Sequence, residues 1–286
     1  MTFWLNGEWR DDEVAINIRD RGVLLGDGLF ETVRVEKGHA AFLNMHLDRL
    51  RNSLAALKIP QVTPEDMPSL INELACRNEC IDQSASMRLT ITRGISERGL
   101  VFSREQQPTV VMTMAPIASP SDAPLTLMVS AYRRGISSIM ARHKTLGYLD
   151  NIMAREEAAN VKADDAIMLN GAGRAACASA ANIFVITPEG KVLTPPLDEG
   201  ALPGIVRQLL LKQAKHYGIQ ILETPIERDM LTGNVLFLSN SLIGLRRAFL
   251  DESNHSTPAM ENIFTQLQTC YQDAFVKSLG QEAGLL

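Results

Sequence analysis

The sequence lacks the features that mark secreted, membrane-bound and small disulfide-bonded proteins. Its 286 residues include only four cysteines, too few for a disulfide framework in a chain of this size. No run approaches the roughly 20 apolar residues that a membrane-spanning helix requires. The first residues lack the charged, apolar and small-residue order of a signal peptide and instead favour a strand. We therefore predict a cytoplasmic protein with reduced thiols and no membrane partner.

An excess of positive charge is also absent. Lys and Arg total 28 against 33 Asp and Glu, a formal net charge of -5. Proteins that bind nucleic acid need clustered basic residues, often interleaved with aromatic ones, so no nucleic-acid partner is expected. Cys76 and Cys80 could share a helix face, but no histidine or second cysteine pair accompanies them. We therefore expect no metal site.

The composition that remains is that of an ordinary globular protein, with 45% hydrophobic and 21% charged residues. A chain of this length favours two compact domains over one. Residues 115–124 hold three prolines among small residues, and proline fixes φ and removes a hydrogen-bond donor. The prediction is an N-terminal domain at 1–115, a linker at 116–124 and a C-terminal domain at 125–286.

Helix and strand patterns alternate too irregularly for a doubly wound parallel sheet, so the predicted class is α+β. Leucines recur at three- and four-residue steps from Leu43 to Leu57, which indicates an amphipathic helix. Pro203 suits the first turn of a helix, and Gly218 suits the residue after its end. The expected strands are 3–5, 30–35, 87–92, 109–114, 125–130, 166–169, 182–187, 220–224 and 235–239, and the expected helices are 43–57, 69–80, 148–161, 203–217 and 258–279.

Two segments of the second half could bind or react with a small molecule. Lys144 lies just before a helical stretch, where a lone lysine is ordinarily a solvated surface charge. The turn at 202–204 leads into a helix, whose first N–H groups and positive dipole end can bind a phosphate. Pro-Gly before a helix is common, however, so this turn is a weak signal when taken alone.

Two further segments could bind the same phosphate. Arg49 lies on the leucine-rich helix and could grip a phosphate bidentately, although a surface ion pair is the plain alternative. Ser241, in the Ser-Asn-Ser sequence at 239–241, could donate its hydroxyl or simply belong to a turn. Each motif is ambiguous alone, and their order and spacing carry more information.

The order of these motifs, together with the sequence GDGLFETVR at 26–34, resembles the fold-type IV pyridoxal-phosphate (PLP) enzymes. This family includes branched-chain aminotransferases, D-amino-acid aminotransferases and 4-amino-4-deoxychorismate lyases. The resemblance extends from about Phe3 to Ala248. It implies a two-domain fold like that of the D-amino-acid aminotransferases, PLP as the cofactor, a small-molecule substrate and a homodimer.

The resemblance also implies roles for individual residues. Lys144 corresponds to the family's Schiff-base lysine and Arg49 to its phosphate-binding arginine. Tyr148 would reach the phenolic oxygen of the cofactor, and Leu202 would pack on its ring. The remaining phosphate ligands would be Gly204, Ile205, Val206 and Ser241, and the strand at 180–184 would pass under the cofactor.

Cys177 is the main departure from the family pattern, which has a glutamate at this position. That glutamate keeps the pyridine nitrogen protonated, so that the ring can accept electrons from a carbanion. A thiol is a weak hydrogen-bond donor, so Cys177 would contact the ring less effectively unless water or another group substitutes for it. Alternatively, Cys177 is only a small buried hydrophobic residue. A weaker electron sink would slow deprotonation of the substrate carbon next to the nitrogen. One alternative is therefore a PLP-binding relative with little turnover.

Other motifs bear on the kind of reaction. The Arg-Gly segment at 93–100 resembles the D-amino-acid aminotransferases, but those enzymes have Tyr where Phe30 stands and His where Leu100 stands. The turn at 240–244 is closer to the aminodeoxychorismate lyases, although Arg246 and Arg247 replace their Pro-Val pair. The sequence therefore favours a lyase over an aminotransferase of branched-chain or D-amino acids.

A lyase of this kind would release pyruvate and form 4-aminobenzoate in the folate pathway. A neutral Lys144 would act as general base, and aromatisation of the product would provide the driving force. That driving force would let the reaction tolerate a weak electron sink. The expected substrate contacts are Phe30, Arg93, Arg98 and Asn240, with Arg246 as a further candidate and surface ion pairs as the alternative for each arginine.

Overall fold

The computed structural model describes residues 1–11, 16–118, 121–250 and 256–282. The chain divides into two compact units, which are described separately. Unit 1 comprises Met1–Ser119, Lys144–Gly147 and Phe275–Leu286, and unit 2 comprises Pro120–His143 and Tyr148–Ala274.

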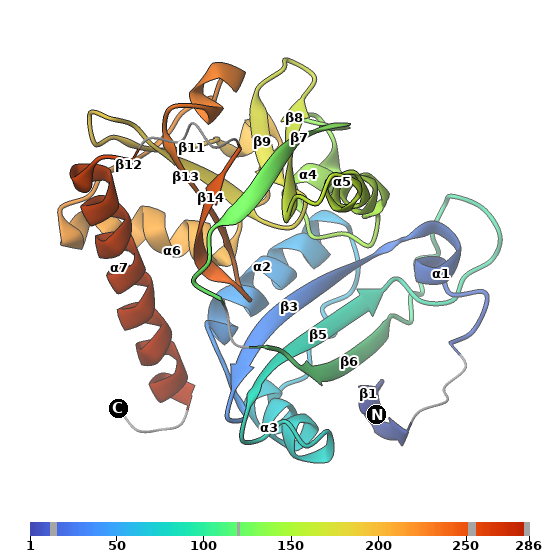
Figure 1. The fold of residues 1–286 in the computed structure, drawn as a ribbon. Coiled ribbons are helices and arrows are strands. Elements are labelled where there is room, and N and C mark those ends of the chain that lie inside the picture. The colour runs from blue at the N-terminus through green and yellow to red at the C-terminus, as the bar shows by residue number, and fades with distance from the viewer. Residues whose placement is uncertain (12–15, 119–120, 251–255, 283–286) are drawn as a thin grey trace. The chain divides into compact units, whose positions relative to one another are not determined.

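Unit 1 is built on a six-stranded antiparallel sheet with the strand order β2-β1-β6-β5-β3-β4. Helix α2 packs against β3, while α3 packs against β1, β4 and β6 (Figure 1). The strands are β1 (Thr2–Leu5), β2 (Glu8–Asp11), β3 (Gly28–Glu36), β4 (His39–Ala40), β5 (Ser84–Thr92) and β6 (Thr109–Pro116), and the helices are α1 (Arg21–Leu25), α2 (Leu43–Ala56) and α3 (Met67–Arg77).

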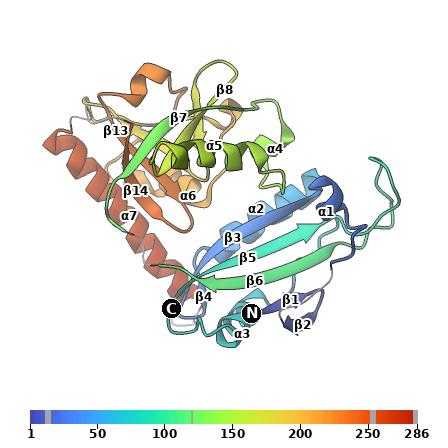
Figure 2. The ribbon, with the colours of Figure 1, turned by 45° about the vertical axis from the view of Figure 1, so that its right-hand side comes forward.

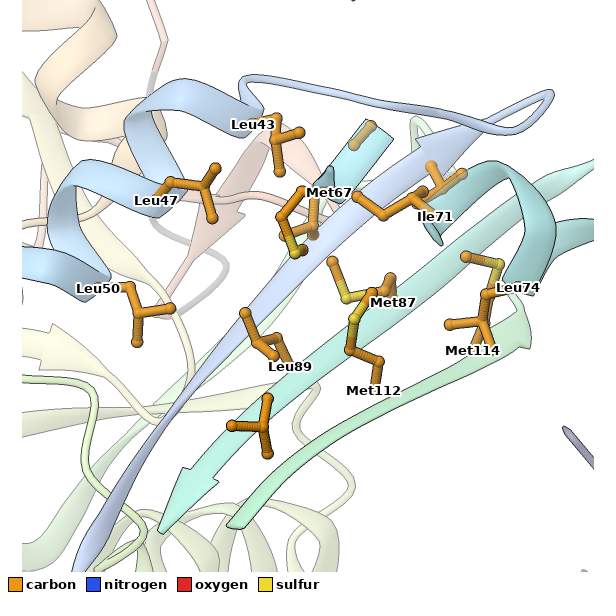
Figure 3. Close-up of a cluster of buried hydrophobic side chains, with 14 of the residues drawn as sticks. Leu43, Leu47, Leu50, Met67, Ile71, Leu74, Met87, Leu89, Met112 and Met114 are labelled. Atoms are coloured by element: carbon orange, nitrogen blue, oxygen red, sulfur yellow. The ribbon is translucent and has the colours of Figure 1, made fainter. Parts of the chain in front are cut away.

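The hydrophobic core of unit 1 lies on the face of this sheet that α2 and α3 cover. Figure 3 shows Leu43, Leu47 and Leu50 of α2 pointing towards the sheet, as do the apolar side chains of α3. Alternate residues of a strand point to opposite faces, so Met87 and Leu89 of β5 are buried while Arg88 between them is exposed. The sheet therefore has one apolar face and one largely polar face.

Unit 2 contains an eight-stranded mixed sheet with the order β12-β11-β10-β13-β14-β7-β8-β9. Helix α5 packs against β7 and β8, and α6 packs against β13 (Figure 2). The strands are β7 (Leu125–Arg134), β8 (Asp165–Asn170), β9 (Ala175–Ala178), β10 (Asn182–Ile186), β11 (Val192–Thr194), β12 (Ile221–Glu223), β13 (Val235–Asn240) and β14 (Gly244–Phe249). The helices are α4 (Ile139–Arg142), α5 (Leu149–Asn160) and α6 (Ile205–Gln213), with 3-10 turns η1 (Leu197–Glu199), η2 (Ala214–Tyr217) and η3 (Arg228–Leu231). The last helix, α7 (Pro258–Glu282), belongs to unit 2 as far as Ala274 and to unit 1 from Phe275.

The α+β class predicted from the sequence is confirmed, and two local predictions are wrong. Helix α6 begins at Ile205 with Gly204 as its N-cap, so Pro203 precedes the helix instead of opening it. Helix α3 ends at Arg77, which leaves Cys80 beyond the helix and unable to share a face with Cys76. Gly218 does follow η2 in the left-handed conformation, at φ 74°.

The expected linker at 116–124 is only partly described, because residues 119 and 120 lie outside the described residues. Strand β6 continues through Pro116, and β7 begins at Leu125. Within the described parts, no helix is long and apolar enough to cross a membrane, and no group of three or more His, Cys, Asp or Glu side chains could hold a metal ion.

Candidate active site

Lys144 belongs to a short segment of unit 1 that pairs with the edge of β3. Phe30 N donates to Lys144 O at 2.9 Å, and Leu146 N donates to Gly28 O at 3.1 Å. Thr145 forms an isolated antiparallel bridge with Leu29 between these two hydrogen bonds. This pairing fixes the backbone of Lys144 beside β3, and its side chain is half-buried.

The amine of Lys144 lies over an aromatic ring. Its Nζ is 4.2 Å from the centroid of Phe30, whose side chain is buried. The negative face of an aromatic ring attracts a cation at this distance. Lys144 is therefore held in a defined, partly desolvated position, in contrast to the solvated surface charge that a lone lysine usually carries.

Arg49 of α2 forms a buried ion pair with Glu31 of β3. Arg49 Nε donates to Glu31 Oε1 at 2.8 Å, and Nη2 donates to Oε2 at 2.5 Å. His46 Nδ1 lies 2.7 Å from the same Oε2, and all three side chains are buried. A two-pronged contact of this kind fixes the plane of the guanidinium as well as its position.

The electrostatics of this cluster fix its protonation states. Burial alone would raise the pKa of Glu31, but Arg49 and His46 outweigh burial and hold that pKa at about 2. Glu31 is therefore ionised, and His46 Nδ1 must be the donor in their hydrogen bond. Burial lowers the pKa of His46; Glu31 opposes this shift, while the charges of Arg49 and Lys144 add to it. The imidazole is thus neutral near pH 7, and the Lys144 amine is close enough to influence it.

The start of α6, in unit 2, is a tight turn with little room for side chains. Asn182 Nδ2 donates to Leu202 O at 2.9 Å, and a Cβ added to Gly204 would lie 1.9 Å from Asn182 Oδ1. Position 204 therefore accepts only glycine without rearrangement. The first N–H groups of a helix have no partner within the helix, and no described side chain caps α6. Ile205 and Val206 thus open the helix at a place where an anion can bind.

Asn240 shapes the turn between β13 and β14. Its Oδ1 accepts hydrogen bonds from Leu242 N and Ile243 N, each at 2.9 Å, and its Nδ2 donates to Ala180 O at 3.1 Å. Ser241 is half-buried in the same turn. The polar atoms of Asn240 therefore organise the backbone around Ser241. This structural role explains the presence of Asn240 without any contact with a substrate.

Cys177 lies in β9 of unit 2 and is 7% exposed. It packs among alanines and Met168. Burial raises the pKa of the Cys177 thiol, with Arg134 opposing the shift and Asp165 adding to it. The thiol is therefore neutral near pH 7. Tyr148, the other cofactor contact expected in this unit, is the N-cap of α5 and is half-buried.

Arg93 has structural contacts on every side of its guanidinium. It donates to Asp27 Oδ2 at 2.8 Å, to Leu57 O at 2.9 Å and to Lys58 O at 3.0 Å. These bonds tie the end of β5 to the end of α2, so they explain the burial of Arg93 without a substrate. Arg98 is exposed. Contact of either residue with a substrate stays a prediction.

The sequence reasoning missed Glu31 and His46. Leu29, Val33 and Val35 of β3 all point into the core of unit 1, and Glu31 occupies the same register. A carboxylate in an otherwise apolar register is a detectable signal, because a buried charge requires a partner. The structure thus places Lys144 against Phe30 and Arg49 against Glu31, all in unit 1, and His46 shares the Glu31 carboxylate with Arg49.

We predict that Glu31→Gln lowers the free energy of unfolding by about 3–5 kcal/mol, because Arg49 stays buried without its counter-ion. The pKa of Glu31 is lowered from 4.5 to about 2 on folding, so its stabilising contribution is complete above pH 4.5 and is lost as the pH falls towards 2. Urea unfolding of both proteins at a series of pH values measures this difference.

Glu73→Gln is the matched control, since Glu73 pairs with Arg77 at 2.6 Å on the surface of α3. An exposed pair contributes about 1 kcal/mol or less. Equal losses in the two variants, or a Glu31→Gln loss that stays constant from pH 7 to pH 3, would contradict a buried ionised pair.

Comparison with known proteins agrees with this arrangement. The amino-transferase class IV family matches residues 28–248. A "Putative branched-chain-amino-acid aminotransferase" of Methanocaldococcus jannaschii is 32% identical over 84% of each chain. An aminodeoxychorismate lyase of Bacillus subtilis is 28% identical over 98% of this chain and 97% of its own. The crystal structure of a branched-chain aminotransferase from Thermoproteus uzoniensis has a TM-score of 0.85 at 25% identity, covering 97% of this chain and 95% of that one. The chain therefore belongs to the class IV aminotransferase family, the fold-type IV enzymes that use PLP.

Proposed function

We propose that this enzyme is a 4-amino-4-deoxychorismate lyase, which releases pyruvate and forms 4-aminobenzoate. The observation that carries the choice is the buried, neutral thiol of Cys177. A neutral thiol cannot supply the negative charge that would keep a pyridinium nitrogen protonated. A reaction that gains an aromatic product depends less on that assistance than transamination does. The relative of Bacillus subtilis, which matches nearly the whole chain, also supports the lyase.

Each unit has residues whose chemistry suits a particular group of PLP. In unit 1, the Lys144 amine can condense with an aldehyde, and Arg49 is a guanidinium of fixed orientation that suits a phosphate. In unit 2, the uncapped start of α6 suits an anion, and Gly204 leaves the backbone accessible. We assign these residues to the cofactor, with Ser241 as a further phosphate ligand and with Tyr148 and Leu202 against the ring. When bound, PLP supplies a ring that withdraws electrons from the carbon next to the substrate nitrogen.

Lys144 would move the proton in this reaction. Its Nζ, once neutral, removes the proton from the ring carbon that bears the substrate nitrogen. The C–O bond to the enolpyruvyl group then breaks with its electron pair going to oxygen, the ring becomes aromatic, and the released enolate takes up a proton to give pyruvate. The contact with Phe30 and the pairing with β3 hold the amine in place for this transfer.

The main test is the product formed from aminodeoxychorismate. We expect PLP-loaded protein to release 4-aminobenzoate and pyruvate in equal amounts, with 4-aminobenzoate followed by its fluorescence. Lys144→Ala should lower kcat by at least about 10²-fold, because general base catalysis contributes about 10²–10⁴-fold.

Lys191→Ala, at an exposed lysine after β10, is the control and should retain full turnover. An aminotransferase would instead give no 4-aminobenzoate and would form glutamate from 2-oxoglutarate and an amino donor. That outcome would favour the second candidate function, an aminotransferase. The 32% identity to the Methanocaldococcus jannaschii protein supports that candidate.

The role of Cys177 gives a separate prediction. Cys177→Glu should speed a transamination half-reaction with an amino acid more than it changes lyase turnover, since the ring then receives the charge on which transamination depends more. Cys177→Ser, which stays neutral, should leave the ratio of the two rates unchanged. Single-turnover absorbance changes and 4-aminobenzoate fluorescence measure both rates, with circular dichroism as a check on folding. Equal effects of Cys177→Glu on the two rates would contradict this explanation.

We also propose that the enzyme is a homodimer. Apolar side chains of unit 1 are unusually exposed on α1 and on the loop after β5: Leu25 is 49%, Leu100 81% and Val101 90% exposed. Arg21 donates to the carbonyls of Gly99 and Leu100, so these two segments lie against each other. A contiguous apolar surface supports a protein interface more than scattered apolar residues do.

The double variant Leu100→Asp, Val101→Asp should therefore convert a dimer into a monomer, because two charges cannot be buried in an apolar interface. Light scattering after size-exclusion chromatography measures the mass. Leu149→Asp, at a leucine of α5 that is 69% exposed, should leave the mass unchanged. A wild-type monomer, or a double variant that stays dimeric, would rule out this interface.

A further inference from the structure

Arg207 places a positive charge in the first turn of α6, in unit 2. It is the third residue of the helix, after Ile205 and Val206, and it is 2% exposed. A Cβ built at the N-cap Gly204 would lie 3.7 Å from Arg207 Cβ, so the two residues are close neighbours. The N-terminal end of a helix carries a partial positive charge, which favours acidic side chains there and disfavours basic ones. Arg207 therefore adds a cation, removed from water, to the end of the helix that is already positive.

The contacts of the Arg207 guanidinium neutralise its charge only in part. Its Nη2 donates to Pro195 O at 2.9 Å and to Glu223 Oε1 of β12 at 2.5 Å. The Nε atom is buried, and within the described part of the chain no group accepts a hydrogen bond from it. The side chain of Glu223 is 46% exposed, and solvent screens an exposed charge more than a buried one. Glu223 is therefore a weak counter-ion for a buried guanidinium.

The buried ion pair of unit 1 shows the contrast. Arg49 pairs with Glu31, whose side chain is 3% exposed, so that both charges of the pair lie in the core. Burying a charge without a buried counter-charge costs free energy. Arg207 bears this cost beside a helix start, where a bound anion can supply the missing negative charge.

We infer that the charge of Arg207 strengthens phosphate binding at the start of α6, although the guanidinium itself contacts protein atoms. Charges interact more strongly inside a protein than in water. A phosphate at the first N–H groups of α6 is therefore stabilised by the guanidinium as well as by the helix end. The phosphate in turn supplies the counter-charge that Glu223 supplies only in part. This inference rests on the proposed assignment of the start of α6 to the cofactor phosphate.

A purely structural role for Arg207 makes the opposite prediction for Glu223. In that role the guanidinium only ties α6 to Pro195 and Glu223, so the loss of either hydrogen bond would loosen the helix start and weaken phosphate binding. In the electrostatic role, loss of the Glu223 charge leaves more of the positive charge of Arg207 for the phosphate and strengthens binding. The two roles thus differ in the sign of one measurable effect.

The test compares PLP with pyridoxal, which lacks the phosphate. Equilibrium dialysis of the whole chain, freed of PLP, gives the affinity for each compound, and the ratio of the two affinities measures the contribution of the phosphate. We expect Glu223→Gln to raise this ratio at least about twofold and Arg207→Gln to lower it at least about threefold. Arg207→Lys, which keeps the positive charge, should retain most of the ratio.

Two exposed residues of unit 2 provide matched controls. Lys212→Gln removes a cation from the last turn of α6, and Glu189→Gln removes a carboxylate from the turn after β10. Neither should change the ratio. The inference is overturned if Glu223→Gln lowers the ratio or leaves it unchanged, or if Arg207→Gln keeps the wild-type ratio. Circular dichroism checks the folding of each variant, and Glu223→Gln decides the question if Arg207→Gln does not fold.

Gly204→Ala separates this inference from the assignment on which it rests. The added Cβ would lie 1.9 Å from Asn182 Oδ1 and would displace the start of α6. A wild-type ratio in Gly204→Ala would overturn the assignment of the phosphate to α6 and the inference with it. A lower ratio in Gly204→Ala, with unchanged ratios in the Arg207 and Glu223 variants, would overturn the inference alone. The lyase reaction is tested independently, by the release of 4-aminobenzoate.

Discussion

The pairing of Lys144–Gly147 with the edge of β3 is the contact on which the rest of the site depends. Two backbone hydrogen bonds place Lys144 beside Phe30. Because side chains alternate along a strand, β3 contributes side chains to both faces of its sheet. Glu31 points into the core and holds Arg49, while its neighbour Phe30 lies under the amine of Lys144. One strand thus sets the positions of the amine and of the guanidinium.

In unit 1 the positive charge of Arg49 is paired with a carboxylate in the core, whereas positive charge gathers on the opposite face of the sheet. Glu31 neutralises Arg49 at the cost of burying both groups, and its pKa of about 2 keeps it ionised at any working pH. The ion pair is a poor source of stability compared with apolar packing, so its retention points to a positioning role for Arg49. On the other face, Lys144 and Arg88 add positive charge over Phe30. Such a distribution suits an anionic cofactor.

Much of this fold follows from sequence patterns, while the meeting of distant segments does not. The leucine steps of α2 and the β-branched run of β3 are local signals, and both elements occur where the sequence predicts them. Strand β14 gave no such signal, because Arg246 and Arg247 interrupt its apolar pattern. The return of Lys144–Gly147 to unit 1 is a tertiary contact that domain limits drawn along the chain cannot show. Family resemblance singled out Arg49 and Lys144, whereas the contacts of Arg93 and Arg88 emerged only from the structure.

We propose that Lys144 is the amine that holds PLP, and the other assignments in the site depend on it. Borohydride reduction of the PLP-loaded protein fixes the cofactor on its lysine, and mass spectrometry of a proteolytic digest then locates it. The account predicts a phosphopyridoxyl group on the peptide that contains Lys144, with the other lysines unmodified. A cofactor fixed on any other lysine, or a reduced protein that carries none, would contradict it.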